Sequence, residues 1–386
     1  MKWEALFLNI MYVLHESGPS FNGASRSALS LIQAASAAGD SLCVVVPLME
    51  GKLIEELRRI PNVEIIESRF YRWKIRRKSN KIKRLLQEYG YTLYYRWKNR
   101  ILAHKLSNIA RKKQIDIIHS NSSVIDMGGL IHAETGIPHV WHVREFGEED
   151  FDMYPLDSEK YFYEFLYNQA SEIICISEAI ANKLRKYIPS DKIEVIYNGV
   201  DFPDQLTLHS DNNNLLISGM ISLKKGQWIA VQAIDILRKK HIDVKLSVAG
   251  KGDLSTLGKA YEDNAESVHI LGFVNDMKSL RKKMDIELMC SVSEGFGRTI
   301  VEAMASGLLV IAANGGAASE IIEDGVNGFL FEVNNPESLA EVIEKVLALD
   351  YAGKKAIREF AFFDASSKYT TDIYVSNVRN SYLQLI

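Results

Sequence analysis

One segment of the sequence combines residue types that suit an anionic, hydroxyl-rich ligand, the stretch Ser293–Glu302 (SEGFGRTIVE). Its two glycines loosen the turn between an apolar strand candidate and a helix that is expected to begin near Arg298. Backbone N–H groups can therefore approach an anion at the N-terminus of that helix. Glu302 lies eight residues after Glu294, so a loop carboxylate and a helix carboxylate can reach different hydroxyls of one ligand. This pattern predicts a site for a sugar nucleotide.

Other turns rich in glycine and asparagine follow strand candidates or join the two halves of the chain. They are Asn198–Asp201, Gly219–Gly226, Ala249–Asp253, Leu271–Val274, Asn314–Gly316 and Asp324–Gly328. Any one of them is weak evidence, because a doubly wound fold needs several such turns to connect strands with helices. Their order along the chain is the informative feature.

Short apolar runs alternate with helical patterns twice along the chain, which is typical of repeated βαβ units and parallel sheets. The regularity stops at the turn-rich stretches 198–203 and 211–214, which indicate an interdomain linker. Expected strands are 6–13, 42–46, 63–66, 115–119, 139–143, 172–176 and 193–196, then 215–218, 244–249, 268–271, 286–289, 309–312 and 329–331. Expected helices are 23–38, 127–135, 178–187 (capped by Ser177), 227–239, 255–264, 277–283, 298–306 and 338–348. The fold class is therefore α/β, with two doubly wound domains.

Taken in order, these segments resemble the retaining family 4 glycosyltransferases (glycosyl transferases group 1). The resemblance implies the GT-B fold, in which two Rossmann-like domains face each other across a cleft. It implies an acceptor-binding domain over 1–200, with a basic insertion at 69–113, and a nucleotide-sugar domain over 201–367. Residues 368–386 are similar to the C-terminal helix that crosses back to the first domain.

The resemblance also implies site residues. The catalytic group comprises Glu294, His142 and Lys225, with Lys225 contacting the diphosphate and His142 following a strand and binding the transferred sugar. Glu302 is expected to bind the ribose hydroxyls and Glu294 the sugar hydroxyls. The expected donor-binding residues are Gly23, Lys225, Val274, Glu294, Phe296, Gly297, Arg298 and Glu302. The chain departs from the family at Met220, where an arginine is usual and where Lys224 or Arg298 can substitute.

The implied function is retaining transfer of a hexose from a nucleoside diphosphate sugar, expected to be a UDP-sugar, in the synthesis of cell-surface polysaccharide or glycoconjugate. The expected acceptor is a saccharide, including one linked to polyprenyl diphosphate. A non-catalytic glycosyltransferase-like subunit that stabilises a partner enzyme is the alternative, and a nucleotide-sugar epimerase is a third reading. Neither a cofactor nor a metal is expected.

Composition sets limits on the remaining functions. Apolar residues make up 47 % and charged residues 25 % of 386 residues, as in soluble globular proteins. We expect neither a membrane span nor a signal peptide, and hence a cytoplasmic protein. The three cysteines lie in apolar runs and are expected to be reduced core residues. Asp150 and Asp152 form a D-x-D sequence, which we interpret as part of a surface loop.

Residues 69–113 hold sixteen Lys and Arg but one acid, a net charge of +15, while the rest of the chain carries −18. Aromatic residues are interleaved with these charges on predicted helices. This composition suits an anionic surface, and we expect the cytoplasmic face of a membrane rather than nucleic acid. A solvated helical hairpin is the plainer alternative.

Excess EDTA is expected to leave glycosyl transfer unchanged, because Lys225 and a helix N-terminus are expected to stabilise the departing diphosphate. Nucleotide release measured with and without chelator checks this. Complete loss of activity, restored by magnesium or manganese, would contradict the metal-free mechanism.

Overall fold

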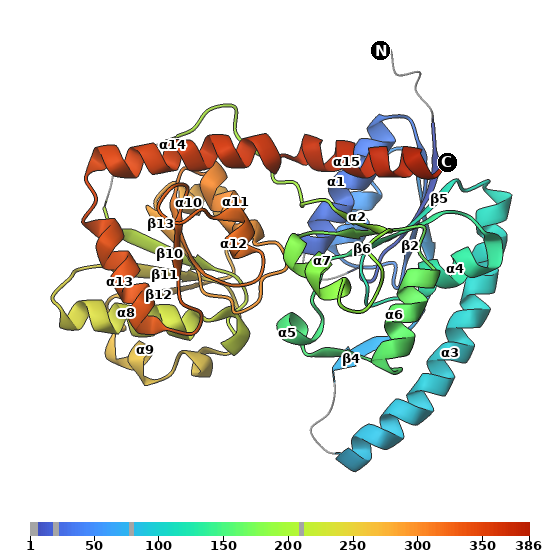
Figure 1. The fold of residues 1–386 in the computed structure, drawn as a ribbon, viewed down its shortest axis with the longest axis horizontal. Coiled ribbons are helices and arrows are strands. Elements are labelled where there is room, and N and C mark those ends of the chain that lie inside the picture. The colour runs from blue at the N-terminus through green and yellow to red at the C-terminus, as the bar shows by residue number, and fades with distance from the viewer. Residues whose placement is uncertain (1–6, 18–22, 77–80, 208–211) are drawn as a thin grey trace. The chain divides into compact units, whose positions relative to one another are not determined.

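The computed structural model describes residues 7–17, 23–76, 81–207 and 212–386. The chain divides into two compact units, Met1–Asn198 with Asp372–Ile386, and Gly199–Thr371 (Figure 1). We call them the N-terminal unit and the C-terminal unit. Residues 18–22, which directly precede the expected donor-binding residue Gly23, lie outside the described residues.

The N-terminal unit contains a parallel seven-stranded sheet in the order β3-β2-β1-β5-β6-β8-β9. Its strands are β1 (Asn9–Val13), β2 (Ser41–Val46), β3 (Val63–Glu67), β5 (Ile117–Ser120), β6 (His139–Val143), β8 (Glu172–Cys175) and β9 (Ile193–Val195). Its helices are α1 (Gly23–Ala37), α2 (Lys52–Leu57), α3 (Lys81–Lys112), α4 (Met127–Thr135), α5 (Glu148–Phe151), α6 (Glu159–Asn168), α7 (Glu178–Leu184) and α15 (Thr371–Leu385).

Alternation along the strands divides this unit's core into two layers. Ile10 and Tyr12 of β1 pack with α1, α2 and α15 on one face of the sheet. Met11 and Val13 pack with α3 and α4 on the other. Because successive side chains of a strand point to opposite faces, a continuous apolar run is what a sheet covered on both sides requires.

The C-terminal unit contains a parallel six-stranded sheet in the order β12-β11-β10-β13-β14-β15. Its strands are β10 (Asn214–Ser218), β11 (Lys245–Ala249), β12 (Val268–Gly272), β13 (Ile286–Met289), β14 (Leu309–Ala313) and β15 (Phe329–Phe331). Its helices are α8 (Gln227–Lys239), α9 (Lys259–Asp263), α10 (Met277–Arg281), α11 (Arg298–Ala305), α12 (Ala318–Ile321), α13 (Pro336–Leu347) and α14 (Tyr351–Lys368).

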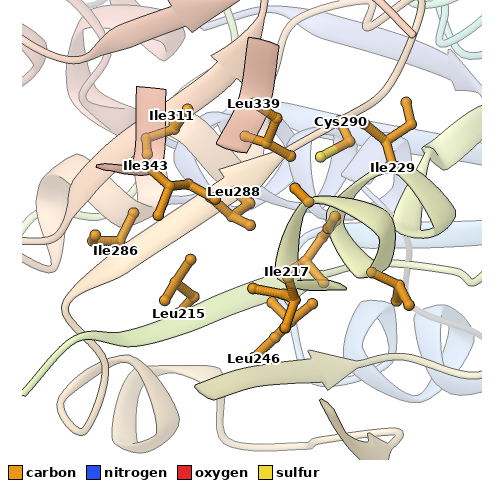
Figure 2. Packing of buried hydrophobic residues seen from close by; sticks show 14 of the residues in the cluster. Leu215, Ile217, Ile229, Leu246, Ile286, Leu288, Cys290, Ile311, Leu339 and Ile343 are labelled. Atoms are coloured by element: carbon orange, nitrogen blue, oxygen red, sulfur yellow. The ribbon is translucent and has the colours of Figure 1, made fainter. Parts of the chain in front are cut away.

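Figure 2 shows the core between this second sheet and two helices, α8 and α13. Leu215, Ile286 and Leu288 of the strands pack with Ile229 of α8 and Leu339 of α13. Glu287 lies between Ile286 and Leu288 in β13 and is buried as well. Its side chain points to the opposite face of the sheet, because side chains alternate along a strand.

Both strand orders reverse once, between β1 and β5 in the first sheet and between β10 and β13 in the second. In open parallel sheets, the loops after the two strands at such a reversal diverge and leave room for a ligand at the carboxyl edge. Because β10 and β13 are paired neighbours, the loops that follow them both start at this edge of the second sheet.

The basic segment differs from a helical hairpin. A short strand, β4 (Lys74–Arg76), pairs antiparallel with β7 (Met153–Pro155), and a single helix of 32 residues, α3, follows. The buried face of α3 includes Tyr95 and Asn99, and Asn99 Nδ2 donates to Asp126 Oδ1 at 2.8 Å. Part of the aromatic content thus belongs to the core.

Two other expectations need correction. The helix expected over 255–264 is a 3-10 turn, Leu254–Leu257, followed by α9, because Gly258 between them has φ +70° and ψ −171°. Asp150 lies in the short helix α5, where its carboxylate accepts hydrogen bonds from the N–H groups of Phe146 and Gly147.

The expected cap of α7 is confirmed, since Ser177 Oγ accepts a hydrogen bond from Ile180 N.

No helix among the described residues has the length and apolar character that crossing a bilayer requires.

Candidate functional site

The loops after β10 and β13 meet through their backbones. Gly226 has φ +70°, and a Cβ atom there would lie 2.2 Å from the carbonyl oxygen of Cys290, so only glycine fits. The preceding 3-10 turn, Leu223–Lys225, is capped by Ser222, whose Oγ accepts a hydrogen bond from Lys225 N at 3.3 Å. This arrangement fixes the position at which the Lys225 side chain leaves the backbone.

Lys225 and Glu294 are brought together, one from each loop. Lys225 Nζ donates to Glu294 Oε2 at 2.8 Å, with side-chain exposures of 34 % and 20 %. An ion pair with this degree of exposure contributes about 0–1 kcal/mol to the stability of the fold. Its two charges can therefore be reorganised around a ligand at low cost.

The Glu294 backbone is held by the loop after β14. Ala317 N donates to Glu294 O at 2.9 Å. A Cβ atom on Gly316 would lie 2.6 Å from that oxygen and 2.7 Å from Glu294 N. Three loops at one sheet edge thus fix where this carboxylate can reach.

Glu302 projects from the first turns of α11, which begins after Gly297 in a left-handed conformation (φ +81°). Its Oε2 accepts from Arg281 Nη1 at 2.8 Å, and its Oε1 lies 3.9 Å from Arg298 Nη1. Both carboxylate oxygens therefore face guanidinium groups.

Arg281 itself lies between two carboxylates. Its Nε donates to Glu287 Oε2 at 2.7 Å and its Nη2 to Glu287 Oε1 at 3.2 Å. Ser218 at the end of β10 also donates to Glu287. Burial alone would lower the pKa of Arg281, but the carboxylates of Glu287 and Glu302 raise it above its usual value, so the guanidinium stays charged.

The other residues expected to bind the donor have different surroundings. Phe296 is buried and packs edge-on against Tyr369, so only its backbone is suited to a polar ligand. Arg298 Nη2 donates to Gly199 O at 2.9 Å. Val274 is half-buried just after β12, and Met220 is exposed where the family usually has arginine.

His142 belongs to the N-terminal unit and lies within β6, so the expectation that it follows the strand is wrong. Its side chain is fully buried beside His119, and Arg144 Nη2 lies 3.3 Å from its Nδ1. Burial first, and the Arg144 charge second, lower its pKa well below the usual value. The ring is therefore neutral, and its Nε2 has no hydrogen-bond partner among the described residues.

The residues after β5 and β6 form a polar cluster at the carboxyl edge of the first sheet. Glu145 Oε1 accepts from Ser122 Oγ, Ser123 N and Ser123 Oγ at 2.6–3.0 Å. Lys74 Nζ donates to Ser123 Oγ at 2.9 Å, and burial lowers the pKa of Lys74 to about 8 despite the nearby Glu145.

The remaining expected donor-binding residue, Gly23, is exposed at the start of α1.

The C-terminal arrangement offers a cation, two carboxylates and a glycine-bounded helix start at one sheet edge. An ammonium and backbone N–H groups can stabilise a diphosphate, while carboxylates accept hydrogen bonds from sugar hydroxyls. No group of three or more His, Cys, Asp or Glu in the described ranges is arranged to hold a metal ion. A ligand that carries a diphosphate and several hydroxyl groups would find a partner for each of them in this arrangement.

Comparisons with known proteins identify the class of protein to which this chain belongs. Residues 201–360 match the family described as Glycosyl transferases group 1, and residues 21–202 match Glycosyltransferase Family 4. An uncharacterized glycosyltransferase of Methanocaldococcus jannaschii is 31 % identical over 292 residues, covering 74 % of this chain and 80 % of that protein. The O-antigen biosynthesis glycosyltransferase WclY of Escherichia coli is 29 % identical over 214 residues, covering 52 % of this chain and 58 % of WclY.

Among solved structures, Anabaena HepE in complex with UDP is similar with a TM-score of 0.77 and 21 % identity, covering 98 % of this chain and 100 % of that one. HepE in complex with UDP-glucose gives 0.73 and 20 %, covering 97 % and 99 %. The chain is therefore a glycosyltransferase with the GT-B fold. It belongs to glycosyl transferases group 1, family 4.

Arg281 and Glu287 were missed by sequence reasoning. Arg281 stands in the run LRKK, which looks like a solvated basic surface. The available signal was Glu287, a carboxylate within the apolar strand Ile286–Met289. A charge inside a buried parallel strand needs a buried partner, and an arginine a few residues earlier is a natural one.

Gly226→Ala is expected to lower the free energy of unfolding of the C-terminal unit by more than about 2 kcal/mol, from left-handed strain plus overlap with Cys290. Differential scanning calorimetry measures the loss. The control is Gly325→Ala, because Gly325 has φ +78° with no atom within 4 Å of the added Cβ. It should lose only about 1 kcal/mol. Equal losses would show that the two loops separate readily.

Proposed function

We propose that the protein transfers a hexose from a UDP-sugar to a saccharide acceptor with retention of anomeric configuration. The observation that carries this proposal is the meeting of Lys225, Glu294 and the start of α11 at the strand reversal of the C-terminal unit. The glycosyltransferase family of the chain and the nucleotide-bound HepE structures support it.

Each donor group has a proposed role. Lys225 exchanges its contact with Glu294 for the diphosphate and stabilises the charge that develops on the leaving UDP. Glu294 then accepts hydrogen bonds from the sugar, and Glu302 from the ribose. Gly297, Phe296, Arg298 and Val274 complete the donor contacts, the first two through their backbones. No metal is required in this scheme.

Retention is proposed to proceed by front-side attack, in which a departing phosphate oxygen accepts the proton of the acceptor hydroxyl. The new glycosidic bond forms as the bond from the sugar to phosphate breaks, so UDP leaves with that proton. His142, neutral and buried, is proposed to orient polar groups rather than transfer a proton. Gly23 lies at the start of α1, where a helix N-terminus can face phosphate.

The acceptor is proposed to bind the N-terminal unit and to be a saccharide, including one linked to polyprenyl diphosphate, in cell-surface polysaccharide synthesis. WclY, an O-antigen biosynthesis enzyme, supports this assignment. A non-catalytic role as a partner of another enzyme is the alternative. The two differ in one measurement, because only the enzyme releases UDP when both donor and acceptor are present.

The enzyme is proposed to be cytoplasmic and to dock on the inner face of a membrane through the exposed face of α3. Leu93, Tyr94, Trp97 and Ile101 are 38–60 % exposed and lie along one side of the helix. Residues 90–112 contain no acid. The basic residues that flank the stripe on both sides are Arg96, Lys98, Arg100, Lys105, Arg111 and Lys112. Apolar and aromatic side chains bordered by cations suit the interface of an anionic bilayer.

Glu302→Ala is expected to weaken UDP binding by roughly 1–3 kcal/mol, because ligand hydroxyls lose a charged hydrogen-bond partner. Isothermal titration calorimetry measures this loss. Glu294→Gln should instead lower turnover more than affinity, since its contact is to the sugar being transferred. Unchanged UDP affinity in Glu302→Ala would refute its assignment to the nucleotide.

Screening nucleotide sugars by thermal shift tests the donor class, since a bound ligand raises apparent stability by mass action. UDP-sugars should raise the melting temperature, and GDP- or ADP-sugars should not. A response to no nucleotide sugar would overturn the proposed function.

Membrane docking predicts that the protein sediments with vesicles containing phosphatidylglycerol at low salt and less so at high salt. Leu93→Glu with Trp97→Glu should remove this binding. Phe363→Glu is the control, because Phe363 is 65 % exposed on α14. Wild-type protein that stays in the supernatant at low salt would refute the proposal.

A further inference from the structure

Arg281 links the interior of the C-terminal unit to Glu302. Its guanidinium uses two N–H groups on Glu287 and another on Glu302. The three residues come from α10, β13 and α11, so the contacts tie together three elements of the face opposite the α8–α13 core.

Burial along this chain of contacts is graded. The side chains of Glu287 and Arg281 are 2 % and 4 % exposed, whereas that of Glu302 is 17 % exposed. Glu302 is therefore the member that reaches solvent. Because Glu287 binds the planar guanidinium at two points, the remaining N–H groups of Arg281 have a fixed direction.

The fixed guanidinium in turn constrains the Glu302 carboxylate. Oε2 points toward Arg281 at 2.8 Å, and Arg298 lies on the side of Oε1. A carboxylate oxygen can accept more than one hydrogen bond, so these contacts orient Glu302 and still allow it to accept from a ligand. Such a group meets a ligand with little loss of side-chain freedom.

We propose that Arg281 is a positioning residue that acts through Glu302. Anchored by Glu287, it holds the Glu302 carboxylate in the orientation that accepts hydrogen bonds from the two ribose hydroxyls of the donor. This inference rests on the proposed function, in which Glu302 binds the ribose. Arg281 is too deeply buried to touch the donor itself.

The test replaces the buried pair as a unit, Arg281→Met with Glu287→Leu, because apolar side chains of similar size often substitute for a buried ion pair without loss of stability. This double variant should bind UDP about 10-fold more weakly in calorimetry. Added to Glu302→Ala, it should cause no further loss, because its effect passes through Glu302.

Ligand dependence separates positioning from general destabilisation. UDP that lacks both ribose hydroxyls (2′,3′-dideoxy-UDP) should bind the wild type and the double variant equally. The control is Arg358→Met, since Arg358 is a buried arginine of the same unit that donates to Asp285 O. This control should lower the melting temperature without changing the ratio of UDP to dideoxy-UDP affinity.

A second variant covers the case in which the double variant does not fold. Arg281→Lys keeps the buried positive charge but cannot contact both carboxylates with the same geometry. It should show the same loss for UDP and not for dideoxy-UDP.

The outcomes separate the two proposals. Losses that add to that of Glu302→Ala, or losses equal for UDP and dideoxy-UDP, overturn the role of Arg281 while the proposed function stands. Wild-type protein that binds no UDP overturns the proposed function, and the inference with it.

Discussion

The candidate donor site depends on the contact between the loops after β10 and β13. The strand order reverses there, so the two loops are neighbours at the carboxyl edge. Gly226 lets one backbone lie against the carbonyl of Cys290 in the other, which brings the Lys225 ammonium to the Glu294 carboxylate. A larger side chain at position 226 would push the two loops apart and so separate Lys225 from Glu294. The ammonium and the carboxylate would then no longer be placed to contact the same ligand.

A second layer of charge lies beneath this surface. Lys225 and Glu294 are partly exposed and can reorganise, whereas Arg281 and Glu287 are buried and cannot. Glu302 is partly exposed as well, and one of its oxygens accepts a hydrogen bond from the buried Arg281. The site thus combines charges that can respond to a ligand with charges that keep a fixed geometry.

Strand and helix periodicity predicted most of the fold, because parallel strands covered on both faces appear as apolar runs. His139–Val143 and Ile286–Met289 have the predicted ends. Helices were expected within 69–113, but the single long helix α3 and its bounds were not, because its apolar residues occur on both its buried and exposed faces. Glycine motifs located Lys225 and Glu294, but no local pattern connects Arg281 with Glu302, since that contact depends on how α10 packs against α11.

Helix α15 has a consequence for the order in which the chain can fold. Tyr374, Val378 and Tyr382 fill one core layer of the N-terminal unit, yet they are translated after the whole of Gly199–Thr371. On the ribosome, the C-terminal unit therefore has all its strands and helices before the N-terminal unit does. Until α15 is synthesised, one apolar face of the seven-stranded sheet of the N-terminal unit stays incompletely covered. Domains usually complete folding in the order of their synthesis, and here that order is reversed.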